Sequence, residues 1–328
     1  MTGPDVPPSS TATVRTVLAD VDPAALGVTF CHEHLILDSP VVAERFPFIH
    51  LPSVEEAVRE VRICVEAGVG TMVDAMPEGG RDLEKLREVS RRTGIHIVAA
   101  TGLHTEKYYR HPFLVTLDPL QAVPAVTKKA VTRKEAGDEA LARRFIDDVA
   151  AGCGVIKAAT GEEGMNARAH RLFESVARAH FETGAPIITH CEDGKGALQQ
   201  VEFFSTRGVP LNRVVLSHTD KVLDAGYHRS LLQSGVNLEY DQALRQTDGE
   251  QSTAVLLARM IGEGYLGQLM LGTDGARRSL WTTLGGSPGL AYLAGEYESV
   301  MQAHGVGPVE RRSLFVENPA RWLPFRRP

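Results

Sequence analysis

Two histidines separated by one residue stand at the end of an early apolar run. His32 and His34 lie in the stretch TFCHEHLILD, residues 29–38. Because alternate side chains of a β-strand point to the same face, the two imidazoles would point together, and Glu33 between them would point away. Imidazole is a common ligand of divalent metals. The pair is therefore either half of a metal site or an ordinary strand end that carries two histidines.

Four further residues that can bind a metal or be modified to do so occur in other apolar runs. Lys157 lies within GVIKAAT, His190 ends PIITH, His218 ends VVLSH and Asp274 ends LMLGTD. Taken alone, each has an ordinary explanation, such as a snorkelling lysine or a helix N-cap. Together with the histidine pair they place six such residues at the same end of five strands. That number exceeds the ligands of one tetrahedral ion and suits two ions held a few Å apart.

The lysine is the unusual member of this set. An ammonium group beside metal cations would be strongly repelled in a buried site of low dielectric constant. A neutral amine, in contrast, reacts with carbon dioxide to give a carbamate, an anion whose two oxygens could bridge two metals. We therefore expect Lys157 to be N-carboxylated.

The elements that must position these residues alternate regularly along the chain. Short apolar runs are followed by amphipathic segments, some with a capping residue such as Ser53 before them or a glycine such as Gly94 after them. Eight strand–helix units in about 300 residues predict an α/β fold, a single (β/α)8 TIM barrel whose active site lies at the C-terminal ends of the strands. An open doubly wound sheet is the alternative, but the chain has no glycine-rich phosphate-binding motif. The predicted strands cover residues 27–31, 69–75, 95–101, 153–158, 186–190, 213–218, 236–239 and 268–271.

Composition narrows the class of protein. The 328 residues carry a formal net charge of -6, which disfavours a nucleic-acid partner because such partners select a basic face. Four cysteines without a CxxC pair indicate reduced thiols and a cytoplasmic protein. No apolar stretch approaches the roughly 20 residues of a membrane span, so we expect no membrane association. Residues 1–13 are predicted to be a disordered N-terminal tail, and residues 14–328 to be one barrel domain.

The chain resembles the phosphotriesterase-related branch of the amidohydrolase superfamily, which includes phosphotriesterase-like lactonases and phosphotriesterase homology proteins. The similar segments are HEHL at 32–35, GRDLEKLREVSRRTGIHIVAATGL at 80–103, GVIKAAT at 154–160, TGAPIITH at 183–190, RVVLSHTD at 213–220, LGTDGARRS at 271–279 and ENPARWL at 317–323. The resemblance implies a binuclear site of two divalent ions, with zinc favoured and manganese, cobalt or iron as alternatives. It implies that His32, His34 and Asp274 hold the more buried ion, that His190 and His218 hold the more exposed one, and that carboxylated Lys157 and a hydroxide bridge them.

The resemblance also implies a reaction. In a metal-dependent hydrolase of this kind, the bridging hydroxide attacks the carbonyl carbon of a lactone or ester, and Asp274 accepts its proton. Phosphotriesters are expected as promiscuous substrates, and the resemblance favours a homodimer. An amidase or deacylase acting on an N-acyl small molecule would use the same chemistry. A non-catalytic barrel that binds a ligand through its metals is a third hypothesis.

Cationic and aromatic residues near the strand ends are the candidates for contacting a small-molecule substrate. Loops after the last strands of such barrels often bind anions, and arginine suits carboxylate or phosphate, so an anionic or sugar-type lactone is favoured. These cations could instead pair with local acids, and the aromatic residues could simply pack in the core. The predicted substrate-binding residues are His104, Tyr108, Lys221, Tyr240, Arg277, Arg278 and Trp281.

Overall fold

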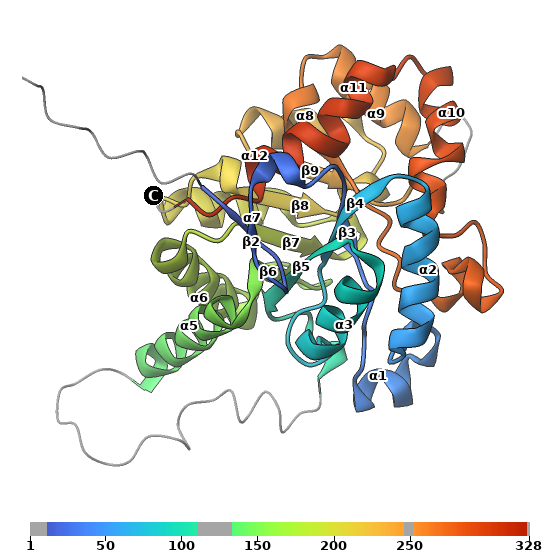
Figure 1. Ribbon diagram of the computed structural model, residues 1–328. Coiled ribbons are helices and arrows are strands. Elements are labelled where there is room, and N and C mark those ends of the chain that lie inside the picture. The colour runs from blue at the N-terminus through green and yellow to red at the C-terminus, as the bar shows by residue number, and fades with distance from the viewer. Residues whose placement is uncertain (1–11, 110–132, 246–251, 327–328) are drawn as a thin grey trace, which may run out of the picture.

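Eight parallel strands form the centre of the protein (Figure 1). The computed structural model describes residues 12–109, 133–245 and 252–326, so nearly all of the predicted tail lies outside the described residues. The strands follow one another around the sheet in chain order, and each neighbouring pair is parallel. They are β3 (Val28–Glu33), β4 (Val69–Asp74), β5 (His96–Gly102), β6 (Cys153–Thr160), β7 (Ile187–Cys191), β8 (Val214–Ser217), β9 (Asn237–Tyr240) and β10 (Leu269–Leu271).

Hydrogen bonds between the two edge strands bring the barrel close to closure. The main-chain carbonyl of His32, in β3, accepts the N–H groups of Thr273 and Asp274 just after β10, at 3.1 and 2.9 Å. The buried carboxylate of Glu33 accepts the main-chain N–H of Thr273 at 2.9 Å and also its hydroxyl. The first strand is thereby tied to the segment that carries Asp274. This arrangement confirms the predicted TIM barrel.

Helices cover the outside of the strands, as the alternating pattern predicts (Figure 1). Ser53 caps the helix Val54–Glu66 by accepting the N–H of Glu56, and the left-handed Gly94 and Gly184 end the helices Leu83–Thr93 and Ala167–Thr183. No helix within the described ranges is both long enough and apolar enough to cross a membrane. The helices between strands are α1 (Pro40–Arg45), α2 (Val54–Glu66), α3 (Leu83–Thr93), α5 (Arg133–Ala151), α6 (Ala167–Thr183), α7 (Ala197–Thr206), α8 (Ala225–Gln233) and α9 (Thr253–Gly262), and α10 (Glu296–Ala303), α11 (Pro308–Arg312) and α12 (Asn318–Trp322) follow β10.

The barrel interior is filled by apolar side chains below the polar strand ends. Val155 and Ile188 belong to the buried cluster inside the barrel, which also contains Trp322 and Val14. Val14 begins a short hairpin formed by β1 (Val14–Arg15) and β2 (Asp20–Val21), which the sequence did not predict. Because strand side chains alternate, the residues two positions after Val155 and Ile188 also point inward. Those residues are Lys157 and His190.

Candidate metal centre

Lys157 is completely buried in β6 at the centre of the barrel. Its Nζ lies 3.4 Å from Nε2 of His32. Burial lowers the pKa of the Lys157 amine to about 8, although the nearby carboxylates of Asp274, Glu239 and Asp241 oppose this change. A substantial fraction of the amine is therefore neutral near physiological pH, which is the form that can react with carbon dioxide.

Asp274 forms one candidate ligand group with His32, near the end of β3, and His34, just after it. The ligand atoms of His32, His34 and Asp274 all lie within 4.8 Å of one another, and Nε2 of His34 is 3.4 Å from Oδ1 of Asp274. Asp274 adopts a left-handed conformation with φ of 43°, which is uncommon for a residue other than glycine. Arg245 supports it by donating to the Asp274 carbonyl at 2.6 Å and to its carboxylate at 3.3 Å. Although burial opposes the charge, Arg245 and the imidazoles hold the pKa of the Asp274 carboxyl well below its usual range.

His190 and His218 lie beside this group, with ring centroids 4.5 Å apart. Nε2 of His190 hydrogen-bonds to the Glu192 carboxylate at 3.0 Å, while its buried Nδ1 has no partner within the described part of the chain. The free nitrogen suits a metal ligand, because the hydrogen bond of one ring nitrogen fixes the role of the other. His218 has a left-handed backbone with φ of 64° at the end of β8. Among the described residues, two of the three non-glycine positions with a left-handed φ, His218 and Asp274, are therefore predicted ligands, and the third is Asp193.

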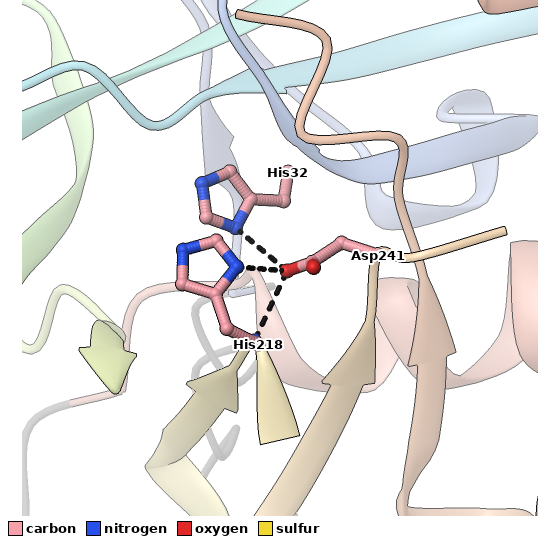
Figure 2. A group of neighbouring side chains, drawn as sticks. All are labelled: His32, His218 and Asp241. Atoms are coloured by element: carbon pink, nitrogen blue, oxygen red, sulfur yellow. Dashed lines mark hydrogen bonds and ion pairs between the residues drawn. The ribbon is translucent and has the colours of Figure 1, made fainter. Parts of the chain in front are cut away.

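Asp241 is a buried residue of the site that the sequence analysis did not identify. Figure 2 shows its carboxylate facing the rings of both His32 and His218. Oδ2 of Asp241 lies 2.7 Å from Nδ1 of His218 and 3.5 Å from Nδ1 of His32. These three residues could hold an ion among themselves. Because Nε2 of His32 faces Lys157, we interpret Asp241 as a carboxylate that orients both rings from behind.

The residues present fit divalent metal ions. Four imidazoles, one ionised carboxylate and a lysine with a lowered pKa converge at the C-terminal ends of β3, β6, β7, β8 and β10. Nitrogen and oxygen donors of this kind suit zinc and its first-row neighbours. Ligand atoms without another partner, such as Nδ1 of His190, are available for coordination.

A cavity of about 310 Å³ opens above these residues. One part of its wall is apolar and comes from the loop after β3 and the end of β4. Another part carries the cations of Lys107, Lys221, Arg245 and Arg277, with Glu192 and Asp193 beside them. The apolar lining residues are Leu37, Phe46, Phe48, Ile49, Met76 and Ala276, and the predicted residues that line the cavity are His34, His104, Tyr108, His190, His218, Lys221, Asp274 and Arg277.

Three predicted substrate-binding residues do not line this cavity, and their contacts explain why. Arg278 donates to the His50 carbonyl at 3.1 Å and pairs with Glu56 at 3.1 Å, so its guanidinium is bound elsewhere. The buried Tyr240 hydroxyl hydrogen-bonds to Nδ1 of His228 at 2.8 Å. The buried Trp281 indole donates to the Gly275 carbonyl at 2.7 Å, so this ring packs beneath the last loop.

The sequence analysis also missed several residues in or behind the cavity wall. Asp241 and Arg245 follow β9 in the stretch YDQALR, and a polar residue directly after a strand end was the available signal. Lys107 and Glu192 pair at 2.9 Å across the loops after β5 and β7. Phe46 and Phe48 belong to the loop after β3, where no periodic pattern marks a role.

Comparison with known proteins agrees with this geometry. A family model described as the phosphotriesterase family matches residues 12–323. The chain is 28% identical to a phospho-furanose lactonase of Mycoplasmopsis synoviae, with 95% of this chain and 91% of the relative covered. It is 24% identical to an N-acetyltaurine hydrolase of Danio rerio, with 95% and 98% covered. The crystal structure of a lactonase from Listeria monocytogenes superposes with a TM-score of 0.84 at 26% identity, with 96% of this chain and all of that chain covered.

Proposed function

This chain belongs to the phosphotriesterase family, and from that premise we propose that it is a binuclear metal-dependent hydrolase of lactones or esters that carry an anionic group. The observation that carries the proposal is the cluster of His32, His34 and Asp274 beside the buried Lys157, at the floor of a cavity that can hold a small molecule. Zinc is the favoured metal, and Lys157 is proposed to be N-carboxylated.

Two bound divalent ions would supply a hydroxide at neutral pH and polarise the substrate oxygen. The residues of the chain orient the reactants around that chemistry. Asp274, kept ionised beside Arg245, is placed to accept the proton of the attacking water at its carboxylate. Asp241 helps to orient the rings of His218 and His32 from their Nδ1 side, where Glu239 also approaches His32 to 3.3 Å. The apolar wall formed by Phe46 and its neighbours limits the access of water to one side of the substrate.

The proposed anionic group follows from the cations of the cavity wall. Lys221 and Arg277 line the cavity, and neither side chain has an ion-pair partner among the residues that the structure describes. A lysine and an arginine that line one cavity without a direct ion pair to a described residue favour a carboxylate, sulfonate or phosphate on the substrate. The similarity to a phospho-furanose lactonase supports the same class of substrate.

A panel of substrates tests the proposal. Protein purified with zinc or manganese should contain about two ions per chain and should hydrolyse lactones that bear phosphate or carboxylate faster than matched neutral lactones. Aryl esters, phosphotriesters and N-acyl amino acids complete the panel. Less than about one ion per chain, or equal rates on charged and neutral lactones, would contradict the proposal.

Amide hydrolysis is the second candidate, because the N-acetyltaurine hydrolase relative is named for an N-acyl substrate. The same cations would bind the anionic end of such a molecule. Faster hydrolysis of N-acyl amino acids or N-acyl sulfonates than of any lactone in the panel would favour this candidate.

A further inference from the structure

The main chain of His104 is held rigidly beside the metal centre. β5 ends at Gly102, whose φ of +100° and close approach to β6 exclude a side chain, because a Cβ there would lie 2.0 Å from the Lys157 carbonyl oxygen. Two residues later, the N–H of His104 donates to the Tyr109 hydroxyl at 2.8 Å, and Arg168 donates to the His104 carbonyl at 3.2 Å. The position of this residue is therefore fixed by contacts on both sides of its backbone.

The imidazole of His104 is also fixed, in one tautomer. The main-chain N–H of Thr105 donates to Nδ1 of His104 at 2.7 Å. Because an amide N–H can only donate, Nδ1 must carry the lone pair, and the neutral ring then carries its hydrogen on Nε2. Within the described part of the chain, no hydrogen bond of the ring uses Nε2. Since His104 lines the cavity, this N–H group is free to donate to a bound molecule.

The imidazole ring of His104 lies beside the ring of His190. Its centroid is 4.5 Å from that of His190, and the His190 centroid is 4.5 Å from that of His218. Tyr108 also packs edge-on against the His104 ring, with the two ring centroids 4.5 Å apart. His104 therefore borders His190, which lines the cavity together with His218.

We propose that His104 is a catalytic residue whose Nε2–H donates a hydrogen bond to the carbonyl oxygen of the substrate in the transition state. The inference rests on the proposed hydrolase function and adds a group that stabilises the oxygen on which negative charge develops. The proton stays on Nε2 of His104 throughout, so this stabilisation requires no proton transfer. A donor that is already oriented in a site shielded from water stabilises this charge strongly, because little reorganisation is needed.

Two matched variants separate this role from simple packing. In His104→Asn, the amide oxygen can still accept the Thr105 N–H, but no donor reaches the position of Nε2. In His104→Gln, the longer amide places an N–H group near that position. We expect His104→Asn to lower kcat by about 10²- to 10³-fold with little change in KM, and His104→Gln to recover part of the loss. The loss should be similar for esters with good and poor leaving groups, and both variants should bind as much metal as the wild type.

Several results would overturn the proposal. These are a kcat of His104→Asn within threefold of the wild type, no recovery in His104→Gln, or a loss confined to substrates with poor leaving groups. Activity restored to His104→Asn by added metal would make the residue a support for the metals instead. NMR spectra of protein with 15N-labelled histidine, in which the His104 signals are assigned by comparison with His104→Asn, should show the Nε2–H tautomer of His104. A proton on Nδ1 of His104 would also overturn the proposal. The NMR measurement needs no substrate, so it tests the His104 tautomer independently of the proposed function. A wild-type protein that is inactive on the whole panel would instead contradict the proposed function.

Discussion

The carboxylate of Asp241 lies 2.7 Å from Nδ1 of His218 and accepts the main-chain N–H of the same residue at 3.0 Å. One side chain thus holds both the ring and the left-handed backbone of a predicted metal ligand. The same carboxylate lies 3.5 Å from Nδ1 of His32. A buried anion at these nitrogens favours protons on Nδ1 and leaves the Nε2 lone pairs available for the proposed metal ions.

Replacing Asp241 by asparagine should therefore weaken metal binding without unfolding the barrel. The amide can still accept one hydrogen bond, but its neutral group no longer favours the required tautomer of both rings. We expect metal affinity to fall by about 10- to 100-fold, measured by competition with a chelator. Asp193→Asn is the matched control, because asparagine tolerates the left-handed φ of 51° at Asp193. Equal affinities in the two variants would contradict the role of Asp241.

Asp274→Asn should keep the fold and lose turnover. Asparagine tolerates the left-handed backbone at this position, and the main-chain bonds to the His32 carbonyl and from Arg245 do not involve the carboxylate. The proton acceptor is lost, so we expect kcat to fall by about 10²- to 10⁴-fold. Steady-state kinetics, circular dichroism and metal analysis of the same sample check this. Near-normal turnover with both metals bound would refute the proposed role.

The carboxylation of Lys157 should have a characteristic pH dependence. The neutral amine attacks carbon dioxide, and burial lowers the pKa of this amine from 10.5 to about 8. Below that pKa the protonated fraction slows the reaction, so in metal-free protein the rate of carbamate formation should rise with pH and level off above about 8. For an exposed lysine, the rate of carbamate formation would continue to rise until about pH 10.5.

Carbamate formation can be followed by NMR with 13C-labelled bicarbonate at a constant concentration of dissolved carbon dioxide. Lys157→Met is the control, since it retains an unbranched side chain without the amine, and it should give no carbamate signal. A wild-type, metal-loaded protein without such a signal would exclude the carboxylated lysine.

The sequence predicted the strands and the six proposed ligands because both depend on local, repeating patterns. Lys157 follows Val155 and His190 follows Ile188 at the two-residue spacing of a strand, so their inward direction is a property of the pattern. The order of the strands followed from the regular alternation with helices. The fold, and the convergence of the six proposed ligands on one end of the barrel, could thus be predicted without coordinates.

The loops could not be predicted in the same way, because their contacts join residues far apart in the chain. Arg277 and Arg278 are neighbours in sequence, yet the first lines the cavity and the second pairs with Glu56. Asp241 acquires its role through His218 and through His32, which lies more than two hundred residues earlier in the chain. The tautomer of His104 likewise depends on one main-chain N–H whose direction no residue pattern reveals.

Arg277 lines the cavity whereas Arg278 pairs with Glu56, so a comparison of variants at these two positions provides the sharpest test of the anionic substrate. Arg277→Met should raise KM for a phosphorylated or carboxylated lactone by about 10- to 100-fold, because a hydrogen bond to a charged group contributes about 1.5–3 kcal/mol. It should leave the KM of a neutral lactone nearly unchanged. Arg278→Met should affect neither substrate, and its half-exposed pair with Glu56 contributes at most about 1 kcal/mol to stability. Equal effects of Arg277→Met on charged and neutral lactones would place the substrate's anion elsewhere, with Lys221 the next cation to test.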